Sequence, residues 1–557
     1  MRISRAGLSL APIVALVLLG LGAAWWRGPQ PELAPPTAAE QADAARLLGA
    51  TRTFLEAAPS GDAGADLGLG GTWFVTSYPR SGAEPVTVRA EGPLGGWAEP
   101  LRRAWPGWLE LDHAFADPPS PRAGPWGYGL DVGLDGWIED GGRVHLPVQF
   151  LLEGLDPPRL ARFLSDHPGK PLRTHAWVAG PNGPLPMLRH SVDPGPLDAE
   201  LLRARIGLAA GYLTRHLGAD RRFDYEWNAR TGDHNEDYNL LRHAGATYSL
   251  FQAFRVTGQE AHYRAGARAL GWLAGVRASD SGDPSRCFEV EAGMVKLGGA
   301  ALTLLALVEQ ASVRPADADF GWMRCLGEHI LAQIEPDGDM ACFYADGGRY
   351  DASGERSAYY PGEAIYALLR LYELDPDPRW LAEARRAADF LVHRRYVALG
   401  TRIAIPLDAW LVQGLELLYR RVPDSAYLDY AFAIGRTIAR DQVSSSLGAP
   451  DLAGAPTLGD WPDSVMAGAR SEALGAAARL ERRFRPGERF FFERLSGMCR
   501  FALRNQLTDS ILFGLRRPMA ALGGFRGSAS TELVRIDGVQ HNLSALVGLL
   551  GLVEQTP

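Results

Sequence analysis

The sequence predicts a mainly α-helical protein, an (α/α)6 toroid of helical hairpins preceded by a small β-rich or α+β domain. From about residue 197 onward, helical periodicity continues almost without a break. Helices that are charged on one side alternate there with helices that are apolar nearly all round, as a ring with an outer and an inner layer requires. Between about 70 and 190 the chain instead has short strand-like runs separated by Gly and Pro.

Length and charge limit the class of protein. The chain has 557 residues, too many for one ordinary core, so one large and one smaller domain are expected. Its formal net charge is −8, from 57 Lys and Arg against 65 Asp and Glu. This balance provides no basic field for a phosphate backbone, so nucleic acid is not an expected partner.

Residues 1–27 have the pattern of a signal peptide or an N-terminal membrane anchor. Two arginines precede a mostly apolar run from Leu8 to Ala24. Small residues near its end fit a cleavage site, whereas Trp25, Trp26 and Arg27 resemble an interfacial belt that would keep residues 8–26 as an anchor. Either reading predicts a periplasmic or extracellular protein, and an anchor would add inner-membrane attachment and the prospect of an envelope protein partner.

The next two segments connect this N-terminus to the helical repeat. Residues 28–60 are expected to form a Pro-rich tether followed by a helix at about 38–57. Residues 61–192 are expected to form the small β-rich domain, with strand-like runs such as GTWFVTSYP and THAWVAG. No motif in this domain predicts an activity.

The four cysteines are far apart in the sequence and none belongs to a CxxC pair: Cys287, Cys325, Cys342 and Cys499. This spacing excludes a familiar structural zinc site, and neither a metal nor a cofactor is expected. One disulfide remains open in an oxidising compartment, with its pairing undetermined.

Residues 193–557 are expected to form the toroid. Its segments before the apolar helices are longer and richer in Gly, Asp and aromatics than the tight turns after them, and strand pairs are expected in RRFDYEWNARTG and GDMACFYADGGRYDAS. An open solenoid shares the hairpin repeat but needs no such set of long loops at one end. The twelve expected helices span about 198–217, 239–256, 259–276, 297–311, 317–334, 361–374, 378–394, 407–420, 425–441, 463–483, 486–505 and 538–553.

In a closed toroid, the N-terminal ends of the inner helices share one cleft. Every hairpin of this sequence brings a carboxylate to that rim, which is more than helix capping requires. Asp237 is either a cap for the helix that follows it or a catalytic acid, and Glu289 and Glu291 alternate in a way that would place both on one strand face. The candidate catalytic acids are Asp237, Glu289, Glu291, Glu363 and Asp408.

Aromatic and basic residues accompany these acids as candidates for substrate binding. Arg242 lies inside an apolar helix and must pair either with a neighbouring acid or with a substrate carboxylate. His243 is either a hydrogen-bonded core histidine or part of the cleft. The full set of candidates for binding is Arg242, His243, Tyr359, Tyr360, Trp410, Trp461, Asp463 and His541.

Carboxylates interleaved with Tyr and Trp suit a carbohydrate cleft, because sugar faces stack on aromatic rings while hydroxyl groups pair with acids, amides and arginine. Glycoside cleavage needs one protonated carboxylic acid at the leaving oxygen and a second carboxylate as base or nucleophile. Acids crowded in one partly dry cleft raise at least one pKa, which supplies the protonated partner.

The helical repeat, with NLLRHAGATYSL, YYPGEAIYALLRLYE and RIDGVQHNLSALVGL, resembles the six-hairpin glycosidase superfamily and its relatives among uronyl C5-epimerases and polysaccharide lyases. The resemblance covers roughly residues 195–555. It implies a carbohydrate-active enzyme with an acidic cleft, often acting outside the cytoplasm. Three functions follow as expectations: a glycoside hydrolase, a uronic-acid lyase or C5-epimerase, and a non-catalytic, membrane-tethered glycan-binding or envelope assembly factor.

Overall fold

The computed structural model describes residues 37–56, short stretches between 67 and 188, and 191–235, 237–344, 356–395, 408–443, 451–456, 462–512, 515, 517–528 and 531–555. The predicted signal or anchor segment, the tether up to residue 36 and Trp461 lie outside these residues. The chain divides into two compact units, one of residues 1–192 with 444–452 and one of residues 193–443 with 453–557. Each unit is described by itself.

The first unit contains a helix and antiparallel strands. Its six-stranded sheet has the order β2-β1-β3-β7-β8-β9, and a three-stranded sheet has the order β5-β4-β6. The helix α2 contacts β3 and β8 of the larger sheet. The elements are α2 (Ala38–Glu56), β1 (Trp73–Ser77), β2 (Val86–Arg89), β3 (Leu111–Ala116), β4 (Gly136–Glu139), β5 (Val144–His145), β6 (Gly169–Leu172), β7 (His175–Gly180), β8 (Gly183–Leu188) and β9 (Ser191–Val192).

The core of this first unit joins one face of α2 to the sheet. Leu47 lies on the helix, and Trp73 and Trp177 lie on β1 and β7, all fully buried. The two indole rings are 5.3 Å apart. Burial of such large apolar rings stabilises a small sheet with a single covering helix.

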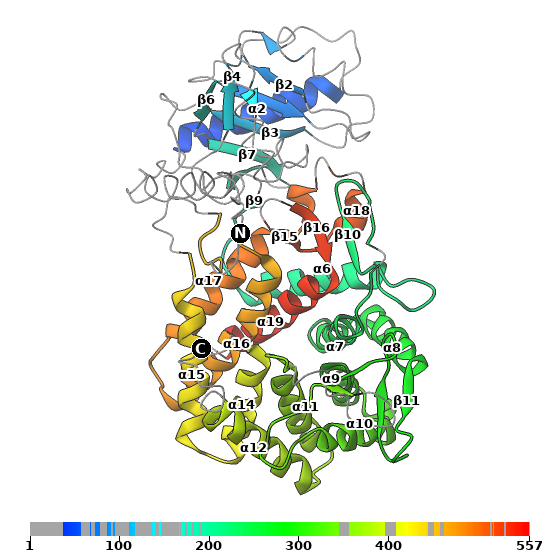
Figure 1. Ribbon diagram of the computed structural model, residues 1–557. Helices are drawn as coiled ribbons and strands as arrows, with labels where there is room; N and C mark the ends of the chain where they lie inside the picture. Colours follow the sequence, from blue (N-terminus) through cyan, green and yellow to red (C-terminus); the bar gives the residue numbers. More distant parts are fainter. Residues whose placement is uncertain are drawn as a thin grey trace, which may run out of the picture. The chain divides into compact units, whose positions relative to one another are not determined.

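The second unit is a closed ring of helices. Each inner helix contacts the next one, and α19 closes the ring onto α7. Figure 1 shows this ring, from α7 in green to α19 in red. The inner helices are α7 (Leu240–Thr257), α9 (Leu297–Val313), α11 (Tyr360–Leu374), α14 (Ala409–Arg421), α16 (Ser464–Phe484) and α19 (Ile536–Glu554).

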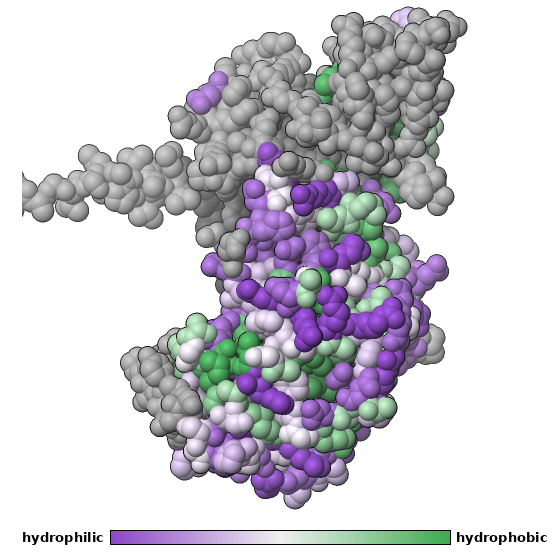
Figure 2. All heavy atoms as spheres, turned by 90° about the vertical axis from the view of Figure 1, so that its right-hand side faces the viewer, coloured by the Kyte–Doolittle hydropathy of each residue, from purple (hydrophilic) through white to green (hydrophobic). Residues whose placement is uncertain are grey.

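An outer layer of amphipathic helices covers this ring, and each outer helix contacts two inner ones. Seen from the side of α8 (Glu260–Gly275) and β11 (Arg277–Ser279), hydrophilic residues cover much of the described surface of this unit (Figure 2). The outer helices are α6 (Ala199–Arg215), α8 (Glu260–Gly275), α10 (Phe320–Ala332), α12 (Pro378–His393), α15 (Ser425–Arg440) and α17 (Phe490–Arg504). This arrangement confirms the predicted (α/α)6 toroid rather than an open solenoid.

Polar residues begin several inner helices, and glycines let those helices approach one another. The side chains of Asn239, Asp408 and Asp463 accept hydrogen bonds from the first turns of α7, α14 and α16, respectively. Gly298 on α9 lies against Glu363 of α11, and Gly362 lies against Asp408. A side chain at either glycine would collide with the neighbouring acid.

The loops before the inner helices contain short strands, but these pair differently from the prediction. Within the described residues, β10 (Glu226–Asn228) pairs with β16 (Thr531–Arg535), from the loop before α19. Similarly, β14 (Phe343–Tyr344) pairs with β13 (Val295–Lys296). These two pairings therefore tie separate loops together around the mouth, because the partner strands come from other hairpins.

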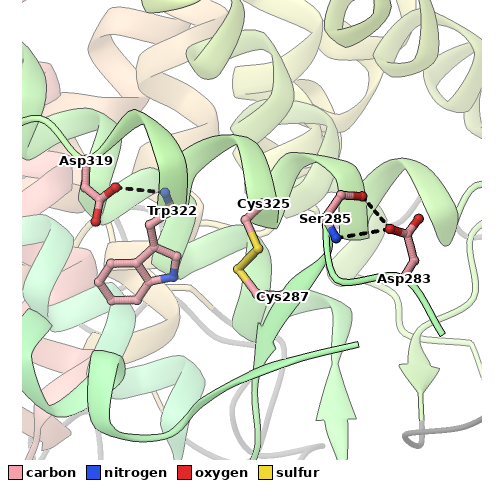
Figure 3. Close-up of a disulfide and its surroundings, with 6 residues drawn as sticks. All are labelled: Asp283, Ser285, Cys287, Asp319, Trp322 and Cys325. Carbon is pink, nitrogen blue, oxygen red and sulfur yellow. Dashed lines mark hydrogen bonds between the residues drawn. A yellow bond between two sulfur atoms is a disulfide. The ribbon is translucent and has the colours of Figure 1, made fainter. Parts of the chain in front are cut away.

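A disulfide joins Cys287 of β12 (Cys287–Glu289) to Cys325 of α10 (Figure 3). It thereby fixes a mouth loop to the outer layer. Of the described cysteines, Cys342 and Cys499 are free and buried.

Among the described helices, α19 is long and apolar enough to cross a membrane. It is, however, an inner helix of the toroid, and most of its apolar window is buried against its neighbours.

Candidate active site

The N-terminal ends of the inner helices bring a set of ionisable groups together. We call Glu363, Asp408, Glu472, Asp537 and His541 the mouth cluster. They come from α11, the cap of α14, α16 and α19, and all except His541 are buried. Glu363 and Asp408 were predicted as catalytic acids and His541 as a binding residue.

Glu363 lies in the first turn of α11, just after Pro361, as the YYPGE pattern predicts. Its side chain is 5% exposed, and its Oε2 atom has no hydrogen-bond partner among the described residues. Burial, reinforced by the carboxylates of Asp408 and Glu472, raises the pKa of Glu363 to about 8. The group is therefore a proton donor at neutral pH.

Asp408 caps a helix with one carboxylate oxygen, and its other carboxylate oxygen takes no part in that cap. Its Oδ1 atom accepts a hydrogen bond from the amide N–H of Leu411 at 3.0 Å, which caps α14. Its Oδ2 atom has no hydrogen-bond partner among the described residues. Burial raises the pKa of Asp408 to about 7, although the contacts with the helix amides oppose that rise. Asp408 can therefore exchange a proton near neutral pH.

Glu472, which is not among the residues predicted from the sequence, lies on α16 beneath the mouth. Its Oε2 atom is 2.9 Å from Nδ1 of His541 on α19. Burial would lower the pKa of His541, but Glu472, and to a lesser extent Asp537, outweigh that effect and raise it. The sequence contains a pattern that could have identified Glu472, because this acid stands among small residues of a helix, in SEALGAAA.

Arg242 is held by a neighbouring acid. Its Nε atom is 2.9 Å from Oδ2 of Asp537, and its guanidinium also donates to the hydroxyl of Tyr225. Asp537 in turn accepts from Nε of Arg535 at 2.7 Å. Of the two alternatives for Arg242, the structure shows the ion pair with a neighbouring acid, and one third of the Arg242 side chain stays exposed beside the cluster.

The predicted aromatic platforms differ in exposure. Tyr359 is 53% exposed beside the first turn of α11, and Tyr360 is partly buried. Trp410 is instead 5% exposed and lies among the rings of Tyr248, Tyr366 and His541, with centroid separations of 6.0–6.4 Å. Because the inner helices enclose it, Trp410 belongs to the barrel interior and is not an open stacking surface at the rim.

His243 is a core residue, which corrects its assignment to substrate binding. The side chain is fully buried, with Nδ1 2.6 Å from the hydroxyl of Tyr238 and Nε2 2.9 Å from the carbonyl oxygen of Ala269. Burial lowers its pKa to about 4. Both ring nitrogens are occupied by protein groups, so none is left for a substrate.

Glu289 and Glu291 do not share one face. Glu289 is buried between α9 and α10, near Thr303 and Trp322, and burial raises its pKa to about 8. Glu291 accepts from the amide N–H of Leu240, at the start of α7, and pairs with Lys296. The strand β12 ends at Glu289, so the alternation that would place both acids together is broken. Neither acid joins the mouth cluster.

Asp237 lies outside the mouth cluster, whereas Asp463 is close enough to Asp537 of that cluster to interact with it electrostatically. Asp237 is exposed and does not cap α7, because Asn239 accepts from the amide of Arg242. It lines a separate hollow of about 290 Å³ with Tyr225 and Tyr238. Asp463 caps α16 by accepting from Met466, and burial raises its pKa.

The mouth therefore holds acid and base groups that titrate near neutral pH within a largely buried setting. Glu363 can donate a proton and Asp408 can accept one. The His541–Glu472 pair can hold or move another proton, and Arg242 offers a positive charge nearby.

The comparisons with known proteins agree with this architecture. No protein-family model and no curated protein matches the sequence. A crystal structure of D-mannose isomerase superposes with a TM-score of 0.50 at 13% identity, over 63% of this chain and 97% of that chain. A cellobiose 2-epimerase from Bacillus thermoamylovorans (TM-score 0.49, 10% identity, 64% and 99% covered) and an α-1,6-mannanase from a Salegentibacter species (0.45, 13%, 63% and 99%) are also similar. The isomerase match shows that the chain has the same toroidal fold.

Proposed function

We propose that the protein is an extracytoplasmic, glycan-active enzyme, and specifically a glycoside hydrolase. The observation that supports this most is Glu363, a carboxyl group kept protonated at neutral pH and placed beside the second acid Asp408. A protonated acid next to a carboxylate that ionises near neutrality is the pair that glycoside cleavage requires.

In the proposed reaction, Glu363 transfers its proton to the glycosidic oxygen while the bond from that oxygen to the anomeric carbon breaks. A water molecule attacks the anomeric carbon, and Asp408 accepts the proton that this water loses. Proton transfer by positioned groups of this kind typically contributes about 10²–10⁴-fold to a rate. The two acids return to their starting states by exchanging one proton with solvent.

Groups around the cluster support recognition of a sugar. Tyr359 is exposed beside Glu363 and offers a ring for stacking. Arg242 keeps part of its guanidinium exposed and can donate to hydroxyl or carboxylate oxygens.

The location outside the cytoplasm is part of the proposal. A disulfide between Cys287 and Cys325 fits an oxidising compartment. The apolar segment at residues 8–26 fits export, with membrane attachment if it is retained.

A second reaction, epimerisation or elimination at a uronic acid, is favoured by one observation. His541 is oriented by Glu472, so it can abstract a proton beside a carboxylate, and Arg242 can neutralise that carboxylate. A third function, glycan binding without turnover, would use the same mouth.

The test is a panel of oligo- and polysaccharides incubated with the full chain in ¹⁸O-labelled water and followed by mass spectrometry. A hydrolase places ¹⁸O at the new reducing end. An unsaturated, ultraviolet-absorbing uronyl end would instead identify a lyase, and uptake of solvent deuterium without cleavage an epimerase. Binding of a glycan with no turnover by any of these readouts would refute catalysis.

A further inference from the structure

A second cavity lies in the toroid, around the middle and C-terminal parts of the inner helices. Glu363 and Asp408 do not line it, although Glu472 of the mouth cluster does. Its volume is about 350 Å³. Four arginines from four inner helices line it: Arg255, Arg370, Arg420 and Arg479. Tyr248, Tyr366 and Glu472 also line this cavity.

These arginines are arranged in two triads, each with one buried glutamate between two guanidinium groups. In the first, Glu309 of α9 pairs with Arg255 of α7 and, at 3.2 Å, with Arg370 of α11. Glu309 is fully buried.

The second triad is built the same way from the other side of the ring. Glu416 of α14 pairs with Arg420 of the same helix and with Arg479 of α16. The Nε and Nη2 atoms of Arg479 donate to the carboxylate at distances of 2.7–3.0 Å. Glu416 is 2% exposed.

The second triad carries one more positive charge than negative. In the first triad Arg370 also pairs with Glu373 at 3.0 Å, which balances its charge, and the charge of Glu472 is balanced by His541. The negative ends of the helix dipoles explain why arginines gather at this end of the ring. Sharing each glutamate between two arginines nevertheless leaves guanidinium donors in excess of the acceptors, because each guanidinium has five N–H groups.

Neutral polar groups complete the lining. The hydroxyl of Tyr248 accepts from Nε2 of Gln252 at 2.7 Å, and Oε1 of Gln252 accepts from Ser544. The Nε2 atom of Gln413 is buried and has no acceptor among the described residues. The cavity is thus polar, partly enclosed and rich in donors.

We propose that this cavity binds a small oxyanion with two or more negative charges, a phosphate or a dicarboxylate, between the two arginine triads. Planar guanidinium groups match such oxyanions with paired hydrogen bonds. The site is separate from the proposed catalytic pair, and its occupation does not depend on the reaction at the mouth.

The test is calorimetric titration of the full chain with inorganic phosphate and, separately, with succinate. Saturable binding with a Kd of about 1 mM or tighter is expected for at least one of them. Arg420→Gln should weaken that binding about 10-fold or more, because one triad loses its excess charge. Arg421→Gln is the matched control, since Arg421 is the exposed neighbour that does not line the cavity, and it should bind like the natural chain.

Arg255→Gln, in the opposite triad, gives an independent measurement if Arg420→Gln does not fold by circular dichroism. The preferred anion, phosphate or succinate, identifies the ligand class. Absence of saturable binding of both anions would overturn the proposal. So would equal weakening by Arg420→Gln and Arg421→Gln, because it would mean a general charge effect.

Discussion

Nδ1 of His541 lies 2.9 Å from Oε2 of Glu472, and this contact joins two inner helices whose residues are 69 positions apart in the chain. The contact holds the imidazole in one orientation and leaves Nε2 without a hydrogen-bond partner among the described residues. It therefore presents one ring nitrogen for proton transfer at the mouth.

Replacing Glu472 by Gln should lower the pKa of His541, because the charge that raises this pKa is removed. Nuclear magnetic resonance titration of the histidine rings measures the change. His262 provides an internal reference, since it is hydrogen-bonded to Thr257 and has no contact with Glu472. An unchanged His541 titration in Glu472→Gln would refute the coupling.

Glu363→Gln should lower turnover of the glycan substrate by about 10²–10⁴-fold, because the proton donor is lost while the shape is kept. In the natural chain, activity should decline as the pH rises through about 8, where Glu363 ionises. Asp237→Asn is the matched control, since Asp237 is exposed outside the mouth cluster, and it should stay within a few-fold of the natural chain. Full activity of Glu363→Gln would contradict the assignment.

The same carboxyl should make folding stability depend on pH. Between the ordinary glutamate range and about pH 8, the folded chain keeps a proton on Glu363 that the unfolded chain has lost. The free energy of unfolding should therefore fall as the pH rises through this interval, by on the order of a few kcal/mol. Chemical denaturation at several pH values measures this slope, and Glu363→Gln should reduce it, leaving the part that comes from the other buried acids with raised pKa values, Asp408 and Glu289. An equal slope in both chains would place its origin elsewhere.

Gly298→Ala should disable the site without altering any ionisable group. The added methyl group would collide with Oε2 of Glu363 and lie 2.6 Å from the ring of Tyr360. We expect a loss of stability of about 1–3 kcal/mol and a large loss of activity. Gly299→Ala is the control, because its methyl group would meet only Leu240 at 3.0 Å and Leu241 at 3.9 Å. Equal activity of the two variants would show that the position of Glu363 does not matter.

Breaking the disulfide should destabilise the toroid. Cys287 and Cys325 are separated by 38 positions, and a loop of that size corresponds to about 3–4 kcal/mol of stabilisation. Cys287→Ser with Cys325→Ser should lower the melting temperature as much as a reductant lowers that of the natural chain. The double variant itself should not respond to the reductant. A response of similar size in the double variant would contradict the role of this bond.

Local patterns in the sequence were enough to predict the repeat and the position of most helices. The apolar helix of residues 297–311 and the YYPGE start of residues 361–374 have their structural counterparts in α9 and α11. Periodicity and caps depend on neighbours within a few residues, so one chain contains that information. The same patterns placed Glu363 and Asp408 at the mouth.

Partners that come from distant hairpins were decided only by the tertiary structure. Glu289 and Glu291 look equivalent in sequence, yet one is buried against α10 and the other accepts from α7. Glu472 belongs to the mouth cluster because it contacts His541. His243 cannot bind substrate because its side chain is fully buried. The sequence by itself determined the helical ring and which acids begin its helices, because those follow from local periodicity. Which acids share protons depends on distances and burial that arise only when the ring closes.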